Sequence, residues 1–479
     1  MRPTQPGWGA SLRTPGCIDP MDHVPHSLRS ARELIPFGVA MSANRHGRVA
    51  AVDRAAGCAY DHKLRRNDLD QSGRRWSAFL VGQLLRRSAQ VVETGLTNQI
   101  DTRRGPGMAS GSYCRIAVTT VTNPHGLACN FDSGSGLLPN SEYWSEIRPE
   151  GTPVALLTSQ PLLDRFQHVR HALGGPPVII VPDGEQGKSL HIVTSVYERL
   201  AAIRFPRTGI IVGMGGGSIT DLAGFVAATW KRGARLVLIP TTLTGQVDAA
   251  IGGKNGVNLT DGKNLVGTIY QPERVIADRA VLGSLPEREF RSGLAEIIKC
   301  GFVGDPAILD LVDSMPTGGP IGDDLLRELI DRSARVKVEL VQQDEHDFGP
   351  RRHLNYGHTL GQAVEAATGY REYNHGEAVG IGMLFAASVA AIVHGARELP
   401  ERTRHYLARV GLPTGLSATV DFERIWSLMG QDKKGGSVGR EFVLCLGPGI
   451  VRLTSMPDRA VAREAFRFVA GGDREAGRD

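Results

Sequence analysis

A short run of glycines directly after an apolar segment limits the fold of this chain more than any other feature of its sequence. Residues 209–224 read Gly-Ile-Ile-Val-Gly-Met-Gly-Gly-Gly-Ser-Ile-Thr-Asp-Leu-Ala-Gly, which is typical of a buried strand, a glycine turn and the start of a helix. Glycines let backbone N–H groups approach a pyrophosphate, and the N-terminus of the next helix favours the same anion. The spacing is not G-x-G-x-x-G, so a purely structural turn is the alternative. The run predicts a nucleotide-binding α/β domain.

Strand and helix signals alternate on both sides of this turn. Apolar strands are expected at residues 115–120, 127–131, 153–158, 178–181 and 236–239, with a helix at 189–203. The last of these strands ends in Pro240-Thr241-Thr242, which places two hydroxyl groups where α/β sheets gather ligands. Amphipathic helices follow, at residues 287–302, 323–343, 361–368, 376–395 and 401–410. The predicted fold is therefore an α/β, Rossmann-like nucleotide-binding domain followed by a mainly α-helical domain.

The first part of the chain differs from the rest in charge and pattern. The chain has 479 residues and a net charge of +5, and the basic excess lies in residues 1–108. We expect a mostly disordered, Arg-rich extension over residues 1–110, or sequence upstream of an alternative start at Met108. Nucleic-acid binding is not expected, because acidic residues are mixed in and no aromatic interleaving is present. The predicted domains are 1–110 for the extension, 111–285 for the nucleotide-binding domain, 286–470 for the helical domain and 471–479 for a tail.

Other features indicate where the protein acts. The longest apolar run, Ala378 to Val393, is shorter than the roughly 20 residues that a membrane span needs, so we interpret it as a buried helix. The six cysteines are scattered without CxxC pairs, as is typical of reduced thiols. No secretory signal follows Met1. These features predict a cytoplasmic protein without a membrane partner.

One carboxylate and two imidazoles form a candidate set of ligands for a divalent metal. Glu296 lies in the helix-like segment Gly-Leu-Ala-Glu-Ile-Ile-Lys, and His358 and His375 each stand beside a glycine in polar surroundings. Three ligands leave one position of a zinc shell open for water or a substrate oxygen, so such a metal acts as a Lewis acid. The alternative is that each is an ordinary solvated or hydrogen-bonded side chain.

Cations gather in a glycine-rich segment between the two halves and again downstream. Residues 246–267, which we expect to form a glycine-rich loop, contain Lys254 and Lys263 together with two aspartates and three asparagines. Lys337 and Arg351 follow, and an Asp-Lys-Lys-Gly-Gly segment begins at residue 432. Arginine can clamp a carboxylate with two hydrogen bonds, whereas lysine is a compact point charge for phosphate. This set indicates an anionic, hydroxylated substrate that carries both groups.

From about Arg115 to Phe468, the sequence resembles the 3-dehydroquinate synthases and the wider sugar-phosphate cyclase family. The resemblance rests on a series of blocks in one order, namely Gly215-Gly-Gly217 with Asp221-Leu-Ala-Gly-Phe, Arg232-Gly, Pro240-Thr-Thr, Val247-Asp248 to Gly253-Lys254, Gly262-Lys-Asn264, Gly293-Leu-Ala-Glu296-Ile-Ile-Lys299, Asn355-Tyr-Gly-His358-Thr, His375-Gly-Glu-Ala and Asp432-Lys-Lys434.

The resemblance implies a bound NAD that is used and regenerated within one catalytic cycle. It also implies a divalent metal, zinc or cobalt, held by Glu296, His358 and His375. The implied substrate is a sugar acid phosphate, 3-deoxy-arabino-heptulosonate 7-phosphate. One alcohol is oxidised transiently, phosphate leaves by β-elimination, and reduction, ring opening and aldol closure give 3-dehydroquinate for aromatic amino acid synthesis. A homodimer is expected.

The resemblance also assigns roles to single residues. Those implied to be catalytic are Asp248, Lys254, Lys299 and His358. Those implied to bind substrate are Arg232, reaching across a dimer interface, with Lys254, Asn264, Lys337, Arg351, Asn355, Gln362 and Lys434. Those implied to bind the cofactor are Glu185, Lys188, Gly215, Gly216, Gly217, Asp221, Thr241, Thr242 and Lys263.

Two departures from the family pattern bear on the substrate and the cofactor. Gln362 stands where the synthases usually have a second histidine, and an amide cannot carry a proton or a positive charge. Residues 157–160, Leu-Thr-Ser-Gln, lack the acidic residue that the family usually presents to the nucleotide. The alternatives are a secondary-metabolism cyclase, such as an aminodehydroquinate synthase or a sedoheptulose 7-phosphate cyclase, a metal-dependent polyol dehydrogenase, and a non-catalytic binding relative.

Overall fold

The computed structural model describes residues 39–43, 49–53, 58–62, 101–104, 112–122, 125, 128–260, 262–317, 319–431 and 441–470. The chain forms two compact units, Met1–Thr97 and Asn98–Asp479. In the first unit, β1 (Val39–Ala43), β2 (Val49–Asp53) and β3 (Cys58–His62) pair as an antiparallel sheet. No strands were expected in this part of the chain, because each apolar alternation is only a few residues long. The rest of the predicted extension, except β4, lies outside the described residues.

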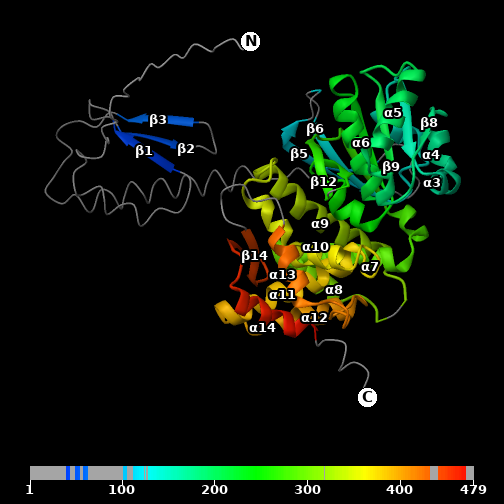
Figure 1. Ribbon diagram of the computed structural model, residues 1–479. Helices are drawn as coiled ribbons and strands as arrows, with labels where there is room; N and C mark the ends of the chain where they lie inside the picture. Colours follow the sequence, from blue (N-terminus) through cyan, green and yellow to red (C-terminus); the bar gives the residue numbers. More distant parts are fainter. Residues whose placement is uncertain are drawn as a thin grey trace, which may run out of the picture. The chain divides into compact units, whose positions relative to one another are not determined.

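The second unit is built on an eight-stranded sheet with the order β4-β5-β6-β13-β10-β9-β7-β8 (Figure 1). In this spatial order, the six strands from β6 through β8 run parallel to one another, whereas β4 and β5 add an antiparallel edge. The strands span Asp101–Arg104 (β4), Ser112–Thr122 (β5), Ala128–Gly134 (β6), Val154–Thr158 (β7), Val178–Ile180 (β8), Ile210–Gly215 (β9), Arg235–Pro240 (β10) and Arg274–Asp278 (β13). Every residue of β7 and β9 is buried, as expected for a parallel sheet that is covered on both faces.

Helices connect the parallel strands, and α6 begins directly after the glycine turn. The α-helices of this half are α2 (Ser141–Ile147), α3 (Gln160–Arg165), α4 (Gln167–Ala172), α5 (Leu190–Ala202) and α6 (Gly217–Thr229). Helix α6 packs very closely on β9, because a Cβ atom at Gly213 would lie 2.4 Å from that of Ala223. The predicted strand, turn and helix are therefore confirmed, and their close packing explains part of the glycine content of the run.

The glycine-rich segment between the two halves is a β-hairpin rather than the loop expected from its composition. A single π-helical turn, Gly245–Ala249, follows β10, and then β11 (Lys254–Leu259) pairs antiparallel with β12 (Gly262–Ile269). Three glycines within the two strands, Gly256, Gly262 and Gly267, conceal the strand pattern. The hairpin presents Lys254 at its start and Lys263 near its turn.

The remainder of the second unit is mainly helical, as predicted. Its helices are α7 (Glu287–Val303), α8 (Ala307–Asp313), α9 (Asp323–Gln343), α10 (His358–Ala367), α11 (His375–His394), α12 (Leu399–Arg409), α13 (Phe422–Gln431) and α14 (Arg459–Ala470). A hairpin of β14 (Glu441–Gly447) and β15 (Ile450–Ser455) was not expected. Helix α11 is long and apolar enough to cross a membrane, but all its residues from Ala378 to Ala390 are buried, so it is the core helix of this half.

Candidate active site

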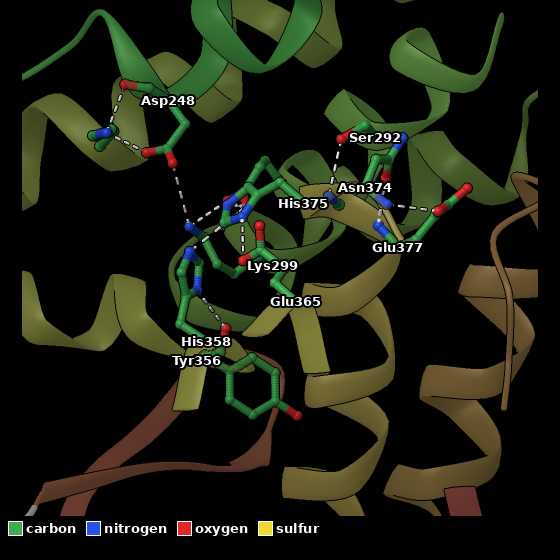
Figure 2. Close-up of polar contacts among 12 residues, drawn as sticks. Asp248, Ser292, Lys299, Tyr356, His358, Glu365, Asn374, His375 and Glu377 are labelled. Carbon is green, nitrogen blue, oxygen red and sulfur yellow. Dashed lines mark hydrogen bonds and ion pairs between the residues drawn. The ribbon is translucent and has the colours of Figure 1, made fainter. Parts of the chain in front are cut away.

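The three predicted metal ligands come together from three different helices. Glu296 projects from α7, His358 is the first residue of α10, and His375 is the first residue of α11. One ligand atom from each lies within 4.8 Å of the others. The carboxylate Oε1 is 3.4 Å from His375 Nε2 and 3.8 Å from His358 Nε2. Figure 2 shows the two imidazoles directed toward one another beside Lys299. His358 and His375, which lie 62 and 79 positions after Glu296 in the chain, thus form one site with it.

Local sequence fixes where the two histidine helices begin. Gly357 adopts a left-handed conformation (φ +82°) just before His358, which any other residue would adopt only with strain. Asn374 and Glu377 form a capping box at the start of α11. The N–H of Gly376 donates to Ser292 Oγ at 2.9 Å, and a Cβ atom there would lie 2.2 Å from the Ser292 carbonyl oxygen. The first turn of α11 therefore packs directly on α7 at Ser292 (Figure 2). Ser292 precedes Glu296 by four residues, which is about one helical turn.

Each histidine is held through the nitrogen that faces away from Glu296. His358 Nδ1 lies 3.3 Å from the carbonyl oxygen of Tyr356, and His375 Nδ1 lies 3.4 Å from Oε2 of Glu365. These contacts at Nδ1 direct both Nε2 atoms toward the Glu296 carboxylate, where a metal would bind. Sequence reasoning missed Glu365, because only the fold shows that its face of α10 meets the start of α11.

The charges of the three residues fit a divalent cation. Glu296 is fully buried, and although burial disfavours its charge, Lys299 and the histidines lower its pKa to about 2. Burial and the nearby Lys299 lower the pKa of His358 to about 3, so that imidazole is neutral. Burial also opposes a charge on His375, but hydrogen bonds with Glu296 and Glu365 raise its pKa to about 10. The proton on His375 shows that the two carboxylates attract positive charge to this position, and a metal ion would displace this proton when His375 becomes a ligand.

A second cluster surrounds Asp248, on the π-turn after β10. Lys337 Nζ donates to the backbone carbonyl of Asp248 at 2.6 Å and also contacts its carboxylate. Lys299 Nζ lies 3.8 Å from the same carboxylate and contacts Glu296 as well. Burial disfavours the Asp248 charge, but Lys299 and Lys337 outweigh burial and hold its pKa far below the usual range. Lys299 therefore joins the metal ligands to this cluster.

Lys254 and Arg351 already have partners on their own chain. Lys254 Nζ lies 2.5 Å from Asp347 Oδ2, and burial together with the nearby Arg351 lowers its pKa to about 8. Arg351 is buried, and its guanidinium donates to the backbone carbonyls of Gly252, at 2.7 Å, and Glu345. Sequence reasoning missed Asp347, because it is 93 positions from Lys254 in the chain.

The predicted nucleotide residues lie at the carboxyl ends of β9 and β10. The N–H of Thr241 donates to Gly215 at 2.9 Å, and Thr242 Oγ1 accepts from the N–H of Gly245 at 3.0 Å. Gly216 and Gly217 begin α6, and a Cβ atom at Gly216 would lie 3.1 Å from Thr242 Cγ2. These close approaches leave a backbone surface without side chains at a helix N-terminus, which fits a pyrophosphate.

Acidic and basic side chains flank this surface. Lys188 contacts Asp221, whose pKa is raised by burial to about 6. Glu185 accepts a hydrogen bond from Asn258 Nδ2 at 2.6 Å, so the hairpin contacts a residue that is predicted to bind the nucleotide. At the end of β7, Thr158 donates to the carbonyl of Met214 at 2.8 Å. The missing acid at this strand end is thus replaced by a hydroxyl that is already bonded within the sheet.

Other predicted site residues are less closely gathered. Asn264 has a left-handed backbone (φ +54°), and its N–H donates to Asn258 at 3.0 Å. Asn355 lies half-buried just before α10, and Gln362 lies half-buried on α10. Arg232 is exposed, in a left-handed conformation at the end of α6. Lys434 lies outside the described residues.

The fold and the site define a class of dinucleotide- and metal-dependent enzymes. Its members join parallel strands and a glycine turn to a helical half that carries one carboxylate and two imidazoles. Family models for the N-terminal and C-terminal parts of 3-dehydroquinate synthase match residues 178–292 and 293–435. The chain belongs to the 3-dehydroquinate synthase family, as the sequence resemblance indicated.

Curated relatives agree with this assignment. A 3-dehydroquinate synthase of Thermobifida fusca (strain YX) is 44% identical over 295 residues, which cover 61% of this chain and 79% of the relative. One from Rhodococcus opacus (strain B4) is 40% identical over 363 residues, which cover 74% of this chain and 95% of the relative. The chain is therefore an enzyme of this family.

Solved structures of two other cyclases share the fold. A 2-deoxy-scyllo-inosose synthase complexed with carbaglucose-6-phosphate, NAD+ and Co2+ is 26% identical, with a TM-score of 0.64 over 71% of this chain and 97% of that one. The 2-epi-5-epi-valiolone synthase ValA from Streptomyces hygroscopicus subsp. jinggangensis 5008, with NAD+ and Zn2+ bound, is 25% identical, with a TM-score of 0.60 over 66% of this chain and 90% of that one. Both of these cyclases bind NAD+ and a divalent metal, and this chain has a group of three side chains that could hold such an ion.

Proposed function

We propose that this chain converts 3-deoxy-arabino-heptulosonate 7-phosphate to 3-dehydroquinate and inorganic phosphate, a step of aromatic amino acid synthesis. The observation that carries the proposal is that Lys299 connects Glu296 of the metal site to Asp248 of a second charged cluster. A reaction that oxidises an alcohol, expels phosphate and closes a ring needs polar groups around several substrate hydroxyls at once. The curated 3-dehydroquinate synthases among its relatives support the same reaction.

Bound zinc or cobalt would supply Lewis-acid polarisation of a substrate oxygen, and NAD would accept and return a hydride. Glu296, His358 and His375 would hold the metal. Asp248 stays ionised, because Lys299 and Lys337 hold its pKa far below the usual range, and it can accept a hydrogen bond from a substrate hydroxyl. Lys299, buried between Glu296 and Asp248, keeps its proton and holds both carboxylates in place.

The anionic groups of the substrate would bind the cations around the start of the hairpin. Lys254, Asn264, Asn355, Gln362 and Lys434 would bind phosphate, and Lys337 and Arg351 would bind the carboxylate. Because Lys254 is paired with Asp347, substrate must compete with this carboxylate. Arginine has five N–H donors and Arg351 uses two on backbone carbonyls, so donors remain for a substrate.

NAD would lie across the carboxyl ends of the parallel strands, with the α/β half acting as a Rossmann-like domain. Its pyrophosphate would meet the backbone of Gly215, Gly216 and Gly217. The flanking contacts would come from Glu185, Lys188, Asp221, Thr241, Thr242 and Lys263. The domain boundaries at residues 110, 285 and 470 remain part of the proposal, although the sheet already begins with β4 at Asp101.

Arg232 supports a homodimer. Its exposed side chain and left-handed backbone place a cation on the surface of this half, away from the contacts described above. In a homodimer it would reach the phosphate of the partner's site, and a cytoplasmic location would suit this metabolic role. Sedimentation of the purified chain and of its Arg232→Ala variant tests for the dimer. The variant is expected to dissociate and to lose activity.

A second candidate is a cyclase of another sugar phosphate, such as aminodehydroquinate synthase or a sedoheptulose 7-phosphate cyclase. Gln362 favours it, because an amide at this position cannot donate a proton to leaving phosphate. A decisive assay measures phosphate release from substrates with and without a carboxylate. Arg351→Ala alone is not decisive, because the change also removes bonds to Gly252 and Glu345. Release only from the sugar acid phosphate supports the synthase, and release only from sedoheptulose 7-phosphate contradicts it.

A further inference from the structure

Glu365 joins a metal ligand to the hairpin of the nucleotide half. It lies on α10, buried, with Oε2 at 3.4 Å from His375 Nδ1 and Oε1 at 3.7 Å from Lys263 Nζ. Lys263 Nζ also lies 3.9 Å from the centre of the Tyr370 ring. Figure 2 shows the Glu365 carboxylate beside the His375 imidazole. One carboxylate thus contacts a ligand with one oxygen and a hairpin lysine with the other.

His375 needs such a partner more than the other two ligands do. Its side chain is 38% exposed, whereas those of His358 and Glu296 are 13% and 0% exposed. The capping box and the Ser292 contact fix the backbone at the start of α11, but they leave rotation of the imidazole free. A hydrogen bond from Nδ1–H to a carboxylate holds the ring with Nε2 toward the metal. It also makes Nε2 a stronger electron-pair donor to the metal.

Lys263 supplies the support that Glu365 needs in turn. It lies on β12, and the same hairpin reaches the nucleotide side through Asn258 and Glu185. The ammonium group balances the buried carboxylate, and the Tyr370 ring holds the ammonium group by a cation–π contact. The position of the hairpin therefore affects how firmly Glu365 holds His375.

We propose that Glu365 is a positioning residue that orients His375 for the metal, and that Lys263 fixes Glu365 so that the hairpin contributes to metal affinity. The inference rests on the metal site of the proposed function, and it concerns metal affinity rather than the substrate.

Competition between the apoprotein and a chelator of known affinity, titrated with Co2+ without NAD or substrate, tests the proposal. Glu365→Ala weakens Co2+ binding by about 10–100-fold, the usual effect of removing such a partner. Glu365→Gln weakens binding less, because its amide oxygen still accepts from Nδ1–H. Lys263→Met weakens binding in the wild-type background and has no further effect when combined with Glu365→Gln.

The matched control is Glu273→Ala, which removes a buried carboxylate that binds Arg235 at 2.6 Å at the opposite end of the strands. This variant keeps wild-type Co2+ affinity. Circular dichroism identifies any variant that fails to fold. If Glu365→Ala does not fold, the Co2+ affinity of Glu365→Gln decides the role of Glu365. Wild-type Co2+ affinity in folded Glu365→Ala or Glu365→Gln overturns the role of Glu365. Additive effects of Lys263→Met and Glu365→Gln overturn the role of Lys263. If the wild-type protein binds Co2+ but releases no phosphate from any sugar phosphate, the proposed reaction fails while this inference can still stand.

Discussion

Lys337 on α9 and Asp248 after β10 form a largely buried ion pair that ties the helical half to the nucleotide half. Lys337 Nζ contacts the carboxylate and donates to the backbone carbonyl of the same residue at 2.6 Å. Burial lowers the pKa of Lys337 itself, so its charge is retained because of Asp248. The pair therefore contributes both to joining the two halves and to shaping the substrate site.

Replacing Lys337 by Met should destabilise the protein. The change leaves Asp248 buried with only Lys299, at 3.8 Å, as a nearby cation. We expect the free energy of unfolding to fall by about 3 kcal/mol, as for other buried pairs that lose one partner. Urea unfolding followed by circular dichroism measures the change. The double variant Asp248→Asn with Lys337→Met should lose less than the sum of its single variants, and strict additivity would show that the two residues are not coupled.

The pH dependence of substrate binding should reflect Lys254. Burial and Arg351 lower its pKa to about 8, so the free enzyme loses this positive charge as the pH rises through 8. Apparent KM for the phosphate substrate should therefore rise above pH 8, by at most about tenfold per pH unit, because only the protonated form attracts the phosphate. Lys254→Arg stays charged at these pH values and should flatten this part of the profile. An unchanged alkaline rise in the Arg variant would assign it to another group.

A methyl group at Gly215 should disturb the nucleotide turn. Its Cβ atom would lie 2.6 Å from Ile219 Cδ1 and 2.7 Å from Ile219 Cβ, in the first turn of α6. We expect Gly215→Ala to cost about 1–3 kcal/mol of stability. Displacing one N–H from the pyrophosphate should also raise the Kd for NAD more than about tenfold. Isothermal titration with NAD measures this loss.

Gly283→Ala is the matched control for the glycine turn. No heavy atom lies within 4 Å of the added Cβ position, and the backbone there is not in the left-handed region. Its NAD affinity and stability should remain close to wild type. Equal losses of NAD affinity in both variants would argue against a nucleotide site at Gly215.

Removing the metal should abolish phosphate release but leave the protein folded. Lys299 contacts Glu296 directly, so the buried carboxylate keeps a cationic partner after chelation. The loss of stability should then equal the binding linkage, about 2.7 kcal/mol for metal at 100 times its Kd. Thermal unfolding with and without chelator measures it, and added Zn2+ or Co2+ should restore activity. Complete unfolding of the apoprotein would show that the metal holds the helices together.

Sequence periodicity predicted the elements whose apolar pattern is strong. The helix at residues 323–343 was placed with its observed bounds, because its apolar face repeats over many turns. By contrast, α10 begins at His358 rather than at residue 361, because its first turn carries no apolar signal before Leu360. The hairpin of β11 and β12 was read as a loop because its glycines hide the alternation. Motifs that depend on residue type were therefore found more readily than irregular backbone.

The metal ligands were predictable because their types and neighbours match a family pattern. Glu365 and Asp347 were not, because their contacts with His375, ten residues away, and with Lys254, 93 residues away, are created only by tertiary packing. The partners of Arg351 are backbone carbonyls, which carry no sequence signal at all. Side chains that hold other functional residues in place are thus the part of the site that sequence reasoning missed.

The most direct test of the central claim is an assay of phosphate release with simultaneous measurement of NADH absorbance. The purified chain, supplied with NAD and Zn2+, is given 3-deoxy-arabino-heptulosonate 7-phosphate, with Glu296→Gln as the control lacking a metal ligand. We predict phosphate release with 3-dehydroquinate as product, no net NADH, and no release by the control. Accumulation of NADH in step with substrate use, or phosphate release that survives Glu296→Gln, would contradict the proposed cyclisation.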